Sequence, residues 1–108
     1  MFFDLLKQTL PETFRSFKRI KGLKKATDKT CWILNRGMSS DPPLRLVIIS
    51  AAASAYHAVA LCSARRVVYD TSNGRECPYG NKRELRAAMA QAGAAHVVAL
   101  YSYAPGRR

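Results

Sequence analysis

The sequence predicts an α+β domain in which N-terminal helices precede a small antiparallel sheet and one further helix is inserted before the last strand. Apolar residues recur at helical spacing in the first 30 residues, whereas short apolar runs separated by turn signals fill the second half. A capped helical segment interrupts those runs near residue 81. The chain has 108 residues, of which 48% are hydrophobic, so we expect one domain with a modest core.

Residues 1–30 form a basic segment that we expect to be helical and amphipathic. Apolar residues recur at helical spacing from Phe3 to Ile20, and Pro11 fits the first turn of a second helix. From Arg15 to Lys25 there are six basic residues and no acidic residue, namely Arg15, Lys18, Arg19, Lys21, Lys24 and Lys25. The apolar stripe predicts packing on the core, and the cationic face is either solvated or binds nucleic acid or an anionic surface.

The next helix is expected around Cys31 and Trp32, with Thr27 or Asp28 as its cap. The sequence Ser-Ser-Asp-Pro-Pro at 39–43 then breaks the chain. We therefore expect a basic helical segment over 1–30, a compact α+β domain over 31–104 and a flexible tail over 105–108.

Strands account for most of the second half. They are predicted at 44–50, 57–62, 67–70 and 96–103, with a turn at 72–74. The alanine-rich run at 51–55 suits either helix or strand. Asn81 begins the inserted helix, Glu84 stands at the position of a capping box, and Gly93 ends the helix.

Residues 47–64 carry no charge, and their number approaches the minimum that spans a bilayer. The segment is rich in alanine and serine and contains Tyr56 and His57, which insert weakly into a membrane. Two short strands explain the same residues, so no transmembrane span is predicted.

The net charge of +11 favours an acidic partner, which is nucleic acid, an anionic membrane surface or an acidic protein. Three cysteines and no secretory signal favour a reducing, cytoplasmic or otherwise intracellular compartment. A zinc site built from His57, Cys62, Cys77 and a fourth ligand is conceivable, but the spacing fits no standard pattern. We expect no metal and no cofactor.

His57 opens one predicted strand and Asp70 closes the next, so a hairpin puts both side chains at the same end of the ladder. A loop centred on residues 63–64 places His57 directly opposite Asp70, and a four-residue loop centred one position later makes them diagonal neighbours. A histidine oriented by a carboxylate is the usual second half of a nucleophilic site, although such a contact is also found in purely structural roles. Cys31 is the candidate nucleophile, because a helix N-terminus favours a thiolate.

Three runs of residues resemble the C-terminal half of papain-like cysteine proteases, especially compact viral leader and bacterial effector proteases. They are His57-Ala58-Val59, Val67-Val68-Tyr69-Asp70 and Asn73-Gly74, followed by the helix from Asn81 and the last strand. Cys31-Trp32 is similar to the Cys–Trp pair that begins the nucleophile helix of that family.

The resemblance implies a thiol peptidase, or a catalytically inactive relative, that acts on a protein or peptide. Cys31 would be the nucleophile, His57 the general base and Asp70 the group that orients the base. Only 25 residues separate Cys31 from His57, whereas the family places a longer helical region there.

Two other functions compete with a peptidase. One is a non-enzymatic basic factor of viral or mobile-element type, with a virion as the alternative location, that binds nucleic acid or a host protein through the basic segment. The other is a protein that docks on a membrane surface through its N-terminal helix.

Overall fold

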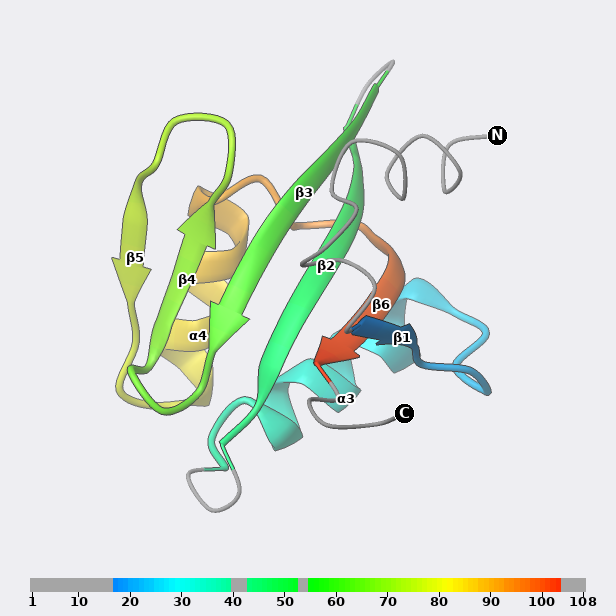
Figure 1. The fold of residues 1–108 in the computed structure, drawn as a ribbon, viewed down its shortest axis with the longest axis horizontal. Helices are drawn as coiled ribbons and strands as arrows, with labels where there is room; N and C mark the ends of the chain where they lie inside the picture. Colours follow the sequence, from blue (N-terminus) through cyan, green and yellow to red (C-terminus); the bar gives the residue numbers. More distant parts are fainter. Residues whose placement is uncertain (1–16, 40–42, 53–54, 104–108) are drawn as a thin grey trace.

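The computed structural model describes residues 17–39, 43–52 and 55–103, which form one antiparallel sheet with two helices on one of its faces (Figure 1). In chain order the elements are β1 (Phe17–Arg19), α3 (Ala26–Arg36), β2 (Arg45–Ala52), β3 (Ala55–Cys62), β4 (Val67–Asp70), β5 (Glu76–Pro78), α4 (Lys82–Gln91) and β6 (Val97–Tyr103). The strands are arranged in the order β1-β6-β2-β3-β4-β5, and all neighbours are antiparallel. The predicted α+β class, with a helix before the last strand, is confirmed.

The main core lies between the helices and one face of the sheet. α3 packs on β6, and α4 packs on β4 and β5. Strand residues alternate between the two faces, so every second side chain enters this core. The largest fully buried members are Ile33, Leu46, Ile48, Val59, Leu61, Val68, Leu85, Val97 and Leu100.

The alanine-rich run is strand rather than helix in its described part. β2 continues through Ala52, and β3 begins at Ala55. β2 lies between β3 and β6 and is hydrogen-bonded on both sides, and this pairing outweighs the weak preference of alanine for helix. Residues 47–52 and 55–62 thus lie on two paired strands, and no described helix is long and apolar enough to cross a membrane.

The hairpin of β3 and β4 adopts the second of the two predicted registers. Val59 pairs with Asp70, which makes His57 the diagonal neighbour of Asp70. The four-residue loop between Cys62 and Val67 contains Arg66 in the left-handed region, with a φ of 53°. The Arg66 guanidinium donates to the Met38 carbonyl at 3.1 Å, so a contact outside the hairpin stabilises this loop.

Between Phe17 and Lys25 the basic segment is not helical. Phe17–Arg19 forms β1, an edge strand paired with β6, because its backbone extends the sheet. The predicted helix is therefore wrong for residues 17–19, and these residues cannot belong to a helix that docks on a membrane surface. Arg15 and the rest of 1–16 lie outside the described residues, as do 104–108.

α3 begins earlier than predicted, with Lys25 and not Thr27 or Asp28 at its N-cap. Asp28 acts from within the first turn, where its Oδ2 accepts the Lys25 backbone N–H at 3.3 Å. Cys31 is consequently the sixth residue of the helix. α3 also runs across the boundary expected at residue 30, and the part of 1–30 that is described packs on the same sheet and core as the rest of the domain.

The region around α4 follows the prediction closely. The Asn81 side chain caps α4 by accepting the Glu84 N–H at 2.8 Å, and Gly93 follows the C-cap with a φ of 89°. The Glu84 carboxylate accepts the N–H of Gly80 rather than that of Asn81, so the capping box is incomplete. β5 was not predicted, and Cys77 within it is a core residue with 3% exposure.

Candidate functional site

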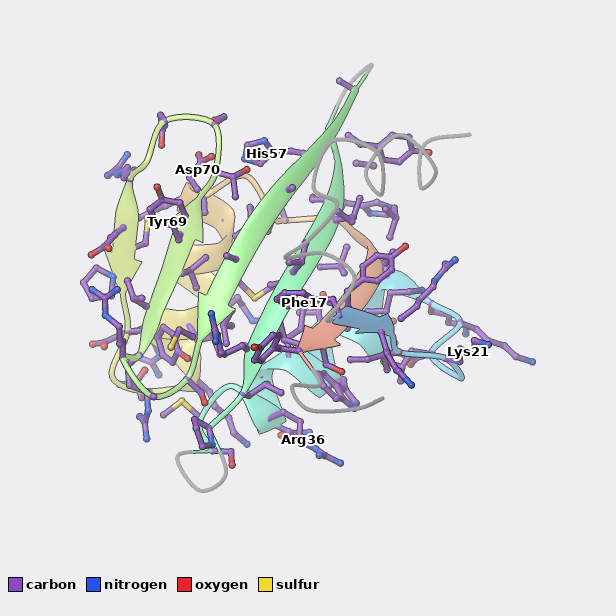
Figure 2. All side chains as sticks on the ribbon, viewed as in Figure 1. Phe17, Lys21, Arg36, His57, Tyr69 and Asp70 are labelled. Carbon is purple, nitrogen blue, oxygen red and sulfur yellow. The ribbon has the colours of Figure 1, made fainter. Side chains whose placement is uncertain are left out.

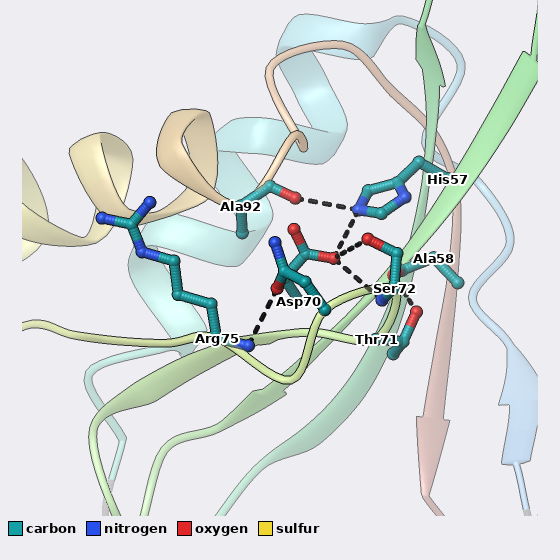
Figure 3. Close-up of polar contacts among 8 residues, drawn as sticks. His57, Ala58, Asp70, Thr71, Ser72, Arg75 and Ala92 are labelled. Atoms are coloured by element: carbon teal, nitrogen blue, oxygen red, sulfur yellow. Dashed lines mark hydrogen bonds and ion pairs between the residues drawn. The ribbon is translucent and has the colours of Figure 1, made fainter.

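His57 and Asp70 meet at one end of the sheet, beside the end of α4 (Figure 2). The His57 Nε2 atom lies 2.9 Å from Asp70 Oδ1 and 3.0 Å from the Ala92 carbonyl oxygen (Figure 3). β3 supplies the histidine, β4 the aspartate, and Ala92 is the C-cap of α4. The pair predicted from hairpin geometry is therefore formed, and α4 contributes a third partner that the sequence did not indicate.

The Asp70 carboxylate is buried, with 7% exposure, and its Oδ1 atom is heavily hydrogen-bonded. It accepts the Ser72 backbone N–H at 3.0 Å and the Ser72 hydroxyl at 2.8 Å, in addition to the His57 contact. The Ser72 backbone N–H is the largest influence on the pKa of the Asp70 carboxyl. Together with the Ser72 hydroxyl and His57, it lowers that pKa below the ordinary value, against the opposing effect of burial. Asp70 is thus held in its ionised form.

Both contacts of the His57 ring fall on the same nitrogen. A carboxylate and a backbone carbonyl can only accept, so the Nε2 atom must carry the proton that they share. In the neutral ring the lone pair is then on Nδ1. Within the described part of the chain, Nδ1 has no hydrogen-bond partner. The arrangement fixes one tautomer and leaves the second nitrogen able to accept a proton.

Gly93 makes room for the ring. A Cβ atom at this position would lie 3.0 Å from His57 Cδ2, which is closer than real Cβ contacts usually come. Its positive φ also directs the chain out of α4 so that the Ala92 carbonyl faces the histidine. The spacing Asp70-x-Ser72, a common side-chain-to-backbone turn, was a signal for the Ser72 contact that the sequence reading missed.

Cys31 occupies a different position from the one that a helix N-terminus would give it. It is exposed in the second turn of α3, where the helix dipole has little effect on a thiol. It lines a cavity of about 340 Å³ together with Thr27, Arg86 and His96, whereas His57 does not line that cavity. The histidine that shares a cavity with Cys31 is therefore His96, which the sequence reading did not single out.

The other two cysteines are placed less favourably. Cys62 pairs with Arg45 on the face of the sheet opposite His57, and Cys77 is buried in the core. No group of three or more histidine, cysteine or acidic residues among the described residues is arranged to hold a metal ion. His57, Cys62 and Cys77 do not converge, so the zinc alternative has no geometric basis.

Five of the six basic residues between Arg15 and Lys25 are described, on β1 and the segment that leads to α3. All five are exposed: Lys18, Arg19, Lys21, Lys24 and Lys25. Lys21 lies beyond β1, far across the sheet from His57 and Asp70 (Figure 2). The basic surface and the His–Asp pair are therefore separate features.

No protein family, curated protein or solved structure was found that matches this chain. The likeness to papain-like proteases remains a prediction from the residues.

Proposed function

We propose that the protein is a thiol hydrolase of the papain-like type, with His57 as general base, Asp70 as the group that orients it and Cys31 as the nucleophile. The observation that carries the proposal is that the Asp70 carboxylate and the Ala92 carbonyl both contact His57 Nε2, at 2.9 and 3.0 Å. Because Asp70 and Ala92 both accept from Nε2, the lone pair of the neutral ring is on Nδ1, where a thiol proton would be received.

The choice of Cys31 rests on accessibility. It is exposed on α3, and α3 covers the same face of the sheet toward which His57 points. Cys62 lies on the opposite face and Cys77 is enclosed in the core, so neither is available to a substrate beside His57. The α4–β6 connection touches both halves of the proposed site, since Ala92 contacts His57 and His96 lines the Cys31 cavity.

Labelling by a thiol-reactive epoxide tests the proposal, with peptide mass spectrometry to report modification at each cysteine. We expect Cys31 to be labelled in the parent and the adduct to vanish in Cys31→Ala. Loss of a general base slows such chemistry by about 10²-fold or more, so His57→Gln should label far more slowly. His96→Gln is the competing variant, because His96 lines the same cavity as Cys31, and it should slow labelling far less than His57→Gln does.

Each outcome has a distinct meaning. If His57→Gln labels as fast as the parent, His57 is not the base. If only His96→Gln slows the reaction, the base is His96. If iodoacetamide modifies Cys31 but the epoxide does not, the thiol is accessible without being activated, and the protein is a catalytically inactive relative.

A second candidate function is binding of nucleic acid by the basic surface around β1. Four of its lysines, Lys18, Lys21, Lys24 and Lys25, are exposed within eight residues of one another, on an edge strand and the turn after it. Exposed lysines on an edge strand also prevent sheet-to-sheet aggregation, which is a structural reason for the same residues. Binding is favoured as the additional role because the charge continues beyond the strand to Lys24 and Lys25.

The salt dependence of binding to a short single-stranded DNA tests this candidate. Each phosphate contact that is lost lowers the slope of log affinity against log salt by about 0.7. The double variant Lys21→Gln/Lys24→Gln should therefore lower the slope by about 1.4, whereas Arg75→Gln/Arg83→Gln, two exposed arginines elsewhere, should not. Equal effects of the two pairs would show that only net charge matters and that this surface is not a site.

A further inference from the structure

A group of polar side chains lies between α3 and α4, apart from the His57–Asp70 pair. It lines the cavity of about 340 Å³ that contains Cys31, here called the Cys31 cavity. Its polar members are Thr27, Thr30 and Cys31 from α3, Arg86 from α4, and His96 from the α4–β6 connection. Among the described residues, no acidic side chain lines it.

Arg86 is the principal charge of the Cys31 cavity. It is exposed, and it forms no ion pair or hydrogen bond with any residue that the structure describes. An arginine guanidinium presents a planar fork of donors that matches a carboxylate. Arg86 is therefore placed to bind an anion that comes from outside the described chain.

His96 and Thr27 provide further donors around the same space. The His96 backbone is fixed at both of its polar atoms, because the Ser50 hydroxyl accepts its N–H at 3.3 Å and donates to its carbonyl at 2.8 Å. Its exposed side chain lines the Cys31 cavity. The hydroxyl of Thr30 is already used, since it donates to the Ala26 carbonyl at 3.0 Å. The available set is one guanidinium, one imidazole and one hydroxyl.

An apolar hollow adjoins the Cys31 cavity. It has a volume of about 160 Å³, shares Thr30, Arg86 and Ala95 with the larger cavity, and adds Met89, Ala90 and Ala94. Arg86 thus stands at the boundary between polar and apolar linings. This combination suits a carboxylate carried on a short aliphatic stem.

We infer that the Cys31 cavity binds the carboxylate of an acidic peptide side chain, with Arg86 as its main partner and His96 and Thr27 as additional donors. The inference rests on the proposed function only in making this peptide the substrate that lies beside Cys31. The anion site itself depends on Arg86 and not on His57.

Charge-matched thiol reagents test the inference at Cys31 itself. The probes are the anionic 2-sulfonatoethyl and the cationic 2-trimethylammonioethyl methanethiosulfonates. In each reaction the Cys31 thiolate attacks the sulfenyl sulfur of the reagent, a disulfide forms, and methanesulfinate leaves. Peptide mass spectrometry gives the two rates at Cys31, and their ratio reports the local potential while cancelling the intrinsic reactivity of the thiol.

We expect Arg86→Gln to lower the ratio of anionic to cationic rate by about fivefold or more, because removing a nearby charge slows one reagent and speeds the other. Arg83→Gln is the matched control, since Arg83 is an exposed arginine of the same helix that does not line the cavity. At physiological ionic strength it should change the ratio by less than about twofold. An unchanged ratio in Arg86→Gln, or equal changes in the two variants, overturns the inference.

Protection from a neutral reagent identifies the anion as a carboxylate. N-acetylglutamate should slow the modification of Cys31 by iodoacetamide in the parent and not in Arg86→Gln, while N-acetylglutamine should protect neither protein. Equal protection by the acid and the amide overturns the assignment of a carboxylate. His57→Gln alters absolute rates but not the rate ratio, so failure of the proposed hydrolase and failure of the anion site are distinguishable.

Discussion

Replacement of Asp70 by asparagine should destabilise the fold, because the carboxylate is buried and its Oδ1 atom accepts three hydrogen bonds. The donors are the Ser72 N–H, the Ser72 hydroxyl and the His57 ring, all between 2.8 and 3.0 Å. An asparagine oxygen can retain such bonds, but it loses the charge that strengthens each by about 1 kcal/mol. Since the three bonds share one atom and are not additive, we expect Asp70→Asn to lower the free energy of unfolding by about 2 kcal/mol.

Urea unfolding at pH 7 measures this loss, and thermal unfolding provides a second readout. For a chain of 108 residues, 2 kcal/mol corresponds to a decrease in Tm of about 9 °C. The matched control is Glu76→Gln, the same chemical change at an exposed carboxylate that pairs with Arg65 at 3.4 Å. An exposed pair of this kind contributes little, so the control should lose less than about 0.5 kcal/mol.

The pH dependence of the Asp70→Asn effect has a definite sign. The pKa of the Asp70 carboxyl is lower in the folded state than its ordinary value of 3.8. The ionised carboxylate therefore contributes its full share to the free energy of unfolding at neutral pH, which is well above 3.8. The difference between parent and Asp70→Asn should therefore be constant near neutral pH and shrink as pH falls below about 4. A difference of under about 0.5 kcal/mol at pH 7, or one that does not shrink in acid, would refute the view that Asp70 is an ionised structural anchor.

Two further substitutions test other parts of the structure. In urea unfolding, Gly93→Ala should lower the free energy of unfolding by about 2 kcal/mol more than Gly22→Ala does, because both positions have positive φ but only a Cβ at Gly93 meets His57. Equal losses in the two variants would mean that the His57 ring tolerates the methyl group. Tyr79→Phe should lower the free energy of unfolding at pH 7 by about 1 kcal/mol, since the buried hydroxyl donates to the Gly37 carbonyl at 2.7 Å. Burial raises the pKa of Tyr79 to about 12, so the stabilisation that the neutral hydroxyl provides is complete below pH 10 and declines above it. If the difference in free energy of unfolding between the parent and Tyr79→Phe grew above about pH 10, this sign would be wrong.

Local patterns were sufficient to predict several elements. The Asn81 cap and Gly93 stop define α4, and β4 begins and ends at the predicted residues. These elements depend on near neighbours in the chain, through side-chain caps, backbone conformation and alternation of apolar residues. The basic segment illustrates the opposite case, since Phe17–Arg19 has a helical apolar spacing but becomes a strand because β6 offers an unpaired edge.

The candidate site divides in the same way. Alternation along two strands is enough to place His57 and Asp70 on one face, whichever register the hairpin adopts. The diagonal register is found together with a loop in which Arg66 contacts Met38, which is 28 residues away in the chain. The position of Cys31 within the helix depends on where α3 begins. The predicted start is wrong because the N-cap is Lys25, and lysine is an uncommon residue for this role.

That a histidine and an aspartate are neighbours on one sheet face follows from the residues of two strands alone, because strand periodicity is local. Which nitrogen of His57 is held depends instead on tertiary packing, since the second acceptor is the carbonyl of Ala92, 35 residues further along the chain. It also decided that Cys31 shares its cavity with Arg86 and His96, because that space exists only once α3 and α4 pack side by side on the sheet.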